Sequence, residues 1–163
     1  MRWEIVRSDS GQEIYNLYKG DEKRLTLIYN PLSNSARVEC NREKRIFQIR
    51  KEGFLRNKTV IRSEYGIKIG EIGSLNKQHF IEVNNEKFYF STENNPLAQL
   101  LLYKDSKDQP VVTCGLHTEN GSAAVFFRRD KILGDMPHPG LLMALCWYLF
   151  LPVARENTVE YAS

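Results

Sequence analysis

The chain of 163 residues is 42% hydrophobic and 26% charged, and its formal net charge is +3. These proportions are typical of a globular domain with a substantial core, and they exclude wholesale disorder. So small a net charge gives no whole-chain reason to expect a nucleic-acid partner, and no nucleic acid is expected. The sequence therefore predicts a single domain over residues 1–163.

The cysteines and the first residues of the chain indicate its compartment. Cys40, Cys114 and Cys146 are far apart in the sequence and lie in apolar surroundings, as is typical of reduced cysteines buried as small hydrophobic side chains. Residues 1–13 contain no apolar core of the kind that a secretory signal peptide needs. We therefore expect a cytoplasmic location, peripheral at a membrane if the chain binds lipid.

Residues 3–133 alternate between short β-rich segments and turn-forming residues. In the segment 36–40, apolar and charged residues alternate strictly, which is the pattern of a strand with one buried face. Asparagine and glycine tolerate the positive φ of a tight hairpin, so the pairs at 84–85 and 120–121 are predicted to be two-residue turns. Strands are predicted at 3–7, 14–18, 25–29, 36–40, 46–49, 58–62, 67–72, 80–83, 87–90, 100–103, 111–116 and 122–127.

One long apolar run follows the strands, and it carries no charge between residues 141 and 151. A helix that is apolar on all sides must be buried. The run therefore predicts a core helix over about 139–151, closed off by Pro152 and followed by a tail at 155–163. Such a helix is about 18 Å long, whereas a membrane span needs about 20 apolar residues. No transmembrane span is therefore expected.

The number of strands and the character of the helix together predict the architecture. A closed eight-stranded barrel is filled by its own side chains, while about twelve strands leave room for a helix of about 10 Å diameter. We therefore predict a mainly β fold, a closed antiparallel barrel of about twelve strands that encloses the C-terminal hydrophobic helix. Because the helix would fill the interior, any binding site is expected on the outer wall or at the rims.

This order of elements resembles the tubby C-terminal-like superfamily, which includes tubby domains, LURP-one-related proteins and phospholipid scramblases. Residues 45–50, Gly53, 58–61 and 66–70 are similar to the early strand pairs of LURP-one-like domains. The resemblance covers nearly the whole chain as an order of elements and implies a non-enzymatic domain. It also implies recognition of phosphoinositide head groups, which tubby-like domains bind through basic residues on their early strands.

The most uneven charge distribution lies between residues 42 and 62, where eight basic residues face only Glu43 and Glu52, a local balance of +6. Basic clusters attract anionic lipid surfaces, so this segment is the predicted site for an anionic phospholipid or phosphoinositide, or for a protein partner. The alternative is a solvated outer face whose charges protect exposed strand edges. The predicted ligand-binding residues are Arg42, Lys44, Arg45, Arg50, Lys51, Arg56, Lys58 and Arg62.

The sequence shows no catalytic or metal-binding constellation. His79, His117 and His138 are widely spaced, and the Cys-x-x-His pair of Cys114 and His117 has no second pair to complete the three or four ligands of a zinc site. No Gly-x-Ser-x-Gly nucleophile motif is present. We therefore predict no metal, no cofactor and no catalytic residue. Two alternatives stay open: a membrane-associated, scramblase-like protein whose C-terminal helix contacts lipid, and an enzyme of unknown type.

Overall fold

The computed structural model describes residues 1–55, 58–93, 99–104, 109–119, 122–129 and 138–161, without the side chains of 116–129 and 154–161. Within these residues all twelve predicted strands are present, and they form one antiparallel sheet in the order of the sequence. The strands are β1 (Arg2–Ser8), β2 (Glu13–Lys19), β3 (Glu22–Asn30), β4 (Ser35–Cys40), β5 (Arg45–Glu52), β6 (Lys58–Ser63), β7 (Lys68–Leu75), β8 (Gln78–Val83), β9 (Glu86–Glu93), β10 (Gln99–Tyr103), β11 (Val112–Glu119) and β12 (Ser122–Arg129), and the helix is α1 (Pro139–Tyr161).

Several of the connecting turns use the positive φ that the tightest hairpins require. Asn84 and Asn85 have φ angles of 51° and 64°, which confirms the predicted two-residue turn between β8 and β9. Asn76 and Lys77, at 50° and 65°, make the same kind of turn between β7 and β8. The other predicted turn, at 120–121, lies outside the described residues, although β11 and β12 pair on either side of it.

Along each strand, successive side chains point alternately to the concave face of the sheet and to its outer face. On β4, Ala36, Val38 and Cys40 are buried, as predicted for 36–40. The two residues between them lie on the outer face, where Arg37 and Glu39 form an ion pair of 2.9 Å. This period of two places the apolar side chains of successive strands against one common core.

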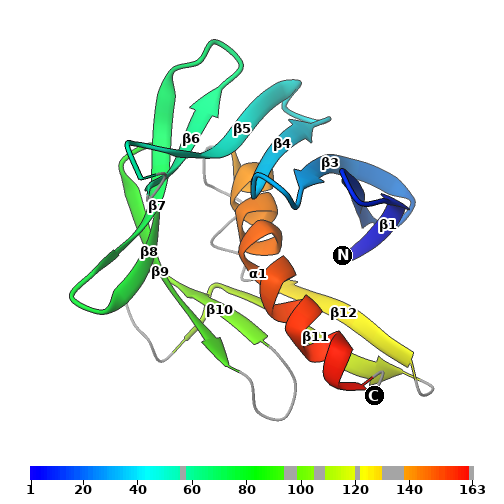
Figure 1. Cartoon of the computed structure of the whole chain (residues 1–163). Helices are drawn as coiled ribbons and strands as arrows, with labels where there is room; N and C mark the ends of the chain where they lie inside the picture. The colour runs from blue at the N-terminus through cyan, green and yellow to red at the C-terminus, as the bar shows by residue number, and fades with distance from the viewer. Residues whose placement is uncertain (56–57, 94–98, 105–108, 120–121, 130–137, 162–163) are drawn as a thin grey trace.

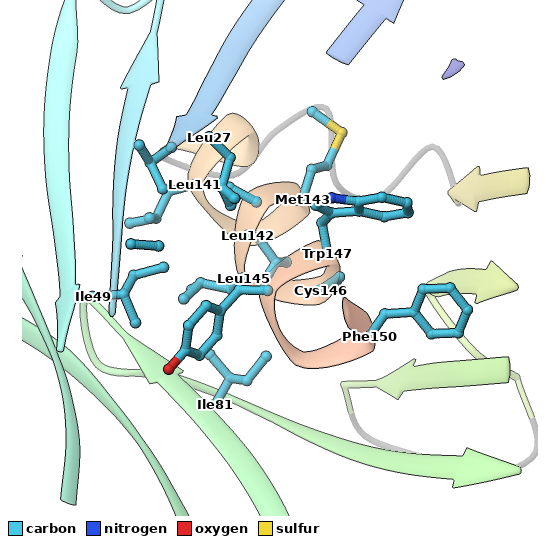
Figure 2. Packing of buried hydrophobic residues seen from close by; sticks show 14 of the residues in the cluster. Leu27, Ile49, Ile81, Leu141, Leu142, Met143, Leu145, Cys146, Trp147 and Phe150 are labelled. Atoms are coloured by element: carbon cyan, nitrogen blue, oxygen red, sulfur yellow. The ribbon is translucent and has the colours of Figure 1, made fainter. Parts of the chain in front are cut away.

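The helix α1 lies in the middle of the curled sheet, with strands on several sides of it (Figure 1). Every residue from 141 to 151 is buried except Leu149, which is half-buried, so the helix has no polar flank. Figure 2 shows Leu145 pointing toward Ile49 and Ile81, while Trp147 and Phe150 point to the opposite side of the helix. The prediction that this helix is buried in protein is confirmed.

The helix runs from one end of the sheet to the other. Its first turn lies at the β4–β5 turn, where Gly140 N donates a hydrogen bond of 3.4 Å to Glu43 Oε1. Two turns further along, Tyr148 Oη donates to the carbonyl oxygen of Asn34, in the β3–β4 turn, at 2.7 Å. Since successive turns of an antiparallel sheet alternate between its two ends, α1 points its C-terminus toward the end that holds the β3–β4 turn.

The helix is longer than the sequence predicted. It spans 23 residues and continues through Pro152 to Tyr161, so the expected tail at 155–163 is helical over most of its length. An internal proline removes one backbone hydrogen bond and costs about 3 kcal/mol, but it does not prevent the next residues from continuing a helix whose first half is fixed by packing. Within the described residues no helix is long and apolar enough to cross a membrane.

The sheet curls around α1, but hydrogen bonds do not close it. The edge strands β1 and β12 approach within 8 Å between Cα atoms, yet no backbone ladder joins them in the described part of the chain. A bulge between Ile5 and Arg7, and the ion pairs of Arg2 with Glu4 and Arg7 with Asp9, mark β1 as an edge strand. The shown architecture is therefore a curled twelve-stranded sheet around a helix, and the closed barrel stays a prediction.

Candidate functional site

The predicted basic residues lie on β5, on β6 and in the turn before β5. Arg42 and Lys44 belong to the β4–β5 turn, at the same end of the sheet as the start of α1. Four more lie on the β5–β6 hairpin, whose turn is at the opposite end. The segment therefore does not form one continuous patch. The four residues on the hairpin are Arg50, Lys51, Lys58 and Arg62. Arg45 is the first residue of β5, and Arg56 lies outside the described residues.

Part of this positive charge is neutralised by ion pairs across the sheet. Glu52 accepts hydrogen bonds of 2.7 and 2.8 Å from Arg62 and one of 2.9 Å from Arg50. Arg62 also donates to the carbonyl oxygen of Gly66 at 2.8 Å, which fastens β6 to the turn that follows it. A third basic residue, Arg45, pairs with Glu64 at 2.7 Å. Arg50 and Arg62 hold the outer face of β5 and β6 together, whereas Arg45 is in register with the buried Cys40, on the concave side of the sheet. All three arginines are engaged in ion pairs and are poorly placed to bind a ligand.

Replacing Glu52 with glutamine is expected to weaken the dependence of stability on acid pH. Hydrogen bonds from Arg62, and then from Arg50, hold the pKa of Glu52 at about 2, below its usual 4.5. A carboxyl group with a depressed folded pKa contributes stability above its unfolded pKa and loses that contribution as the pH falls toward the folded value. The free energy of unfolding, measured with urea, should therefore fall less between pH 4.5 and about 2 in Glu52→Gln than in the unaltered protein.

Removing the partner of Glu52 provides the control for that measurement. Arg62→Ala should flatten the same pH window, because it removes the largest cause of the low pKa. The ion pairs are accessible to water, so added salt should shrink the difference between the variants. Identical acid profiles for all three proteins would show that Glu52 and Arg62 are not paired in solution.

Four of the predicted basic residues, Arg42, Lys44, Lys51 and Lys58, are exposed and form no ion pair among the described residues. Lys58 lies close enough to Glu71 to help lower the pKa of that carboxyl group, whose main partner is Lys68. The charge left for a ligand is therefore divided between the two ends of β5.

The β5–β6 hairpin also exposes apolar residues that the sequence interpretation passed over. Gly53 turns the chain with φ of 94°, and the next two residues project from the hairpin. Phe54 is fully exposed and Leu55 is 76% exposed. The signal was present in the sequence, because an apolar pair directly after a turn glycine, inside a basic segment, has no strand face to cover it.

The end of the sheet near the start of α1 holds a structural contact instead of a ligand site. Glu43 Oε2 lies 2.9 Å from Nδ1 of His138, and its other oxygen accepts a hydrogen bond from Gly140 N. A carboxylate at this position satisfies a free N–H group of the first turn and complements the helix dipole. The adjoining cavity, beside Arg42 and Met143, has a volume of about 80 Å³. Ligand pockets are usually about 300 Å³ or larger, so this cavity is too small for a head group.

A second hollow, of about 500 Å³, lies where β8 begins and β9 ends, away from the β8–β9 turn, and includes the ring of His79. That ring stacks on Phe90 with 5.4 Å between centroids. Ser91 and Thr92 also line the hollow, but His79 is hydrogen-bonded to neither of them in the described part of the chain. A nucleophile needs a base within hydrogen-bond reach, so this geometry gives no support to catalysis by His79.

The cysteines are core residues. Burial raises the pKa of Cys40 and of Cys146 to about 12 and that of Cys114 well above its ordinary value, so all three are protonated thiols at neutral pH. The side chain of His117, the other half of the Cys-x-x-His pair, lies outside the described residues. Across the described residues, no group of three or more histidine, cysteine, aspartate or glutamate side chains could hold a metal ion.

Comparisons with known proteins assign no role to these residues. No protein-family model matches the chain, and neither a curated protein nor a solved structure matches it.

Proposed function

We propose that the chain is a non-enzymatic tubby-like domain, related to the LURP-one-like proteins, whose sheet closes around α1 and which binds anionic phospholipid head groups. The order of twelve strands followed by one buried helix supports the fold assignment. The observation that carries the binding proposal is at the β5–β6 hairpin. There Lys51 and Lys58, which are exposed and form no ion pair among the described residues, flank the exposed apolar residues Phe54 and Leu55.

The chemistry of the hairpin suits an anionic bilayer surface. A lysine near such a surface contributes about 1 kcal/mol of attraction, and two contribute about 2 kcal/mol, or a factor of about 30 in affinity. Arg50 and Arg62 remain paired with Glu52 and keep the outer face of β5 and β6 in shape. Lysine also matches the diffuse charge of a lipid surface, because its ammonium group needs no fixed partner geometry.

The buried position of α1 favours binding through the outer surface over binding through the helix. Between residues 141 and 151 the helix packs against the strands, with Leu149 alone half-buried, so contact with lipid would require this core to open. A hydrophobic cluster of that size contributes much of the net stability of a domain, so opening it would unfold most of the protein.

Removing both hairpin lysines should weaken binding to anionic membranes about 30-fold. The measurement is co-sedimentation of Lys51→Ala/Lys58→Ala with vesicles of phosphatidylcholine containing phosphatidylserine, at low salt. The matched control is Lys19→Ala/Lys23→Ala, which removes two exposed lysines beside the β2–β3 turn, at the other end of the sheet. This control should lose little affinity.

Two results would overturn the proposal. One is no binding of the unaltered protein to anionic vesicles, and the other is an equal loss of affinity in both double variants. Vesicles in which phosphoinositide replaces phosphatidylserine at equal total charge separate two kinds of recognition. Equal affinity for the two compositions assigns the binding to surface charge, whereas tighter binding to phosphoinositide assigns it to that head group.

A further inference from the structure

Of the eight exposed large hydrophobic residues in the described part of the chain, four lie on one set of hairpin turns, two on the edge strand β1 (Ile5 and Val6) and two at the β6–β7 turn (Tyr65 and Ile67). The strands follow one another in sequence order and are all antiparallel, so the β3–β4, β5–β6 and β7–β8 turns lie at the same end of the sheet. Each of these hairpins exposes at least one large hydrophobic residue at or beside its turn. These residues are Leu32 (84% exposed), Phe54 (fully exposed), Leu55 (76%) and Leu75 (56%).

We propose that this end of the sheet inserts its hairpin tips into the hydrocarbon boundary of an anionic bilayer. The inference rests on the proposed function and adds to it the surface that enters the membrane and the orientation of the molecule. We call this surface the apolar rim, defined by Leu32, Phe54, Leu55 and Leu75. A single exposed apolar residue needs no explanation, but here such residues recur on three neighbouring hairpins at one end of the sheet.

Charge complementarity selects a bilayer as the occupant. Lys51 and Lys58 flank the β5–β6 tip, and Lys77 lies in the β7–β8 turn directly after Leu75 and Asn76. Apolar residues that penetrate and lysines that stay at the head groups are the two parts of an interfacial anchor. The tips also project from separate hairpins, an arrangement that suits a fluid lipid surface better than the closely shape-matched core of a protein interface.

The tips are held in place by local hydrogen bonds and backbone geometry. In the β3–β4 turn, the side-chain oxygen of Asn30 accepts hydrogen bonds from the N–H groups of Leu32, at 3.0 Å, and Ser33, at 3.2 Å. In the β5–β6 turn, the positive φ of Gly53 directs the chain so that Phe54 projects. Turns fixed in this way present their apolar residues without a large loss of conformational entropy on binding.

The rim also fixes how the protein would lie on the membrane. The helix α1 starts at the β4–β5 turn and runs toward the β3–β4 turn, as its contacts with Glu43 and Asn34 show. Its C-terminus therefore points toward the membrane. At the opposite end the described residues expose the pair Tyr65 and Ile67 in the β6–β7 turn, and these serve as an internal control.

Fluorescence of an introduced indole tests insertion directly. Phe54→Trp should shift its emission to shorter wavelength on anionic vesicles and should be quenched when the vesicles contain dibrominated phosphatidylcholine. Tyr65→Trp, at the other end of the sheet, should show neither effect. The buried Trp147 and the partly buried Trp3 stack on each other and supply a background emission, which is measured with the unaltered protein.

The affinity of polar variants for anionic vesicles is a second, independent test of insertion. Phe54→Ser/Leu55→Ser should lower affinity for anionic vesicles about a hundredfold, since each lost apolar side chain costs about tenfold. Tyr65→Ser/Ile67→Ser should change it less than about twofold, because these residues would face away from the bilayer.

The outcomes separate insertion from head-group binding. If Phe54→Trp protein sediments with anionic vesicles but its emission is unchanged and unquenched, insertion is wrong while the proposed function stands. If the unaltered protein sediments with no vesicles, both are wrong. A dimer in the absence of lipid that Phe54→Ser/Leu55→Ser dissociates would assign the rim to a second copy of the chain, and would also overturn insertion.

Discussion

Replacing Trp147 with aspartate is expected to abolish folding into a soluble domain. The ring of Trp147 is 4% exposed, stacks on Trp3 with 4.9 Å between centroids and meets Tyr15 edge-on at 5.6 Å. Loss of a buried tryptophan costs about 3–5 kcal/mol, and an unpaired buried carboxylate costs several kcal/mol more. Together these costs match the whole net stability of a typical domain, about 5–15 kcal/mol.

The fraction of the protein in the soluble extract and its near-ultraviolet circular dichroism measure this effect. The matched control is Leu32→Asp, which introduces the same charge at a residue 84% exposed and should leave folding intact. Trp147→Phe keeps an apolar ring and should fold with reduced stability. Soluble Trp147→Asp protein with an unchanged near-ultraviolet spectrum would mean that α1 is not the core of the fold.

The strands and the burial of the helix were predictable because both depend on local patterns. Strict alternation at 36–40 requires one buried face, and β4 has it. The apolar residues at 141–151 leave the helix no side to turn toward water, and all of them are buried except the half-buried Leu149. Neither inference needs knowledge of which strands meet in space.

Charge pairing was not predictable, because it depends on which residues the sheet brings together. Glu52 and Arg62 are ten residues apart in sequence but bond across β5 and β6. Glu43, counted as one opposing charge in a basic segment, instead contacts the first turn of a helix 97 residues later, at Gly140. A count of charges along the sequence therefore overestimated the free positive charge between residues 42 and 62.

Sequence patterns also do not specify where the helix ends or whether the sheet closes. Proline is a common stop signal, but the cost of Pro152 is one missing hydrogen bond and a local clash, which the rest of a packed helix can absorb. The number of strands sets the width that a barrel would have, but it does not specify whether β1 and β12 exchange hydrogen bonds.

Gly70→Ala is expected to destabilise the fold by about 3 kcal/mol, the upper end of the usual cost of overpacking. A Cβ atom at Gly70 would fall inside the contact distance of the carbonyl oxygen of Glu82 on β8 and would lie 3.2 Å from Cδ1 of Ile61 on β6. The obstacle is backbone, which cannot rotate away, so β7 and β8 would have to separate where Gly70 pairs with Val83. The φ of Gly70 is not positive, so the effect is steric and not conformational.

Two other glycines make this a graded series that tests the sheet geometry. At Gly73 an added Cβ would lie 2.8 Å from the tip of the Phe80 ring, which can shift, so Gly73→Ala should cost less than Gly70→Ala. At Gly11 the nearest atom is 3.8 Å away, so Gly11→Ala should be nearly neutral. Urea denaturation midpoints measure the order. A Gly70→Ala midpoint equal to that of Gly11→Ala would contradict the close approach of β7 to β8, and with it the register that sets the β7–β8 turn and Leu75 at the apolar rim.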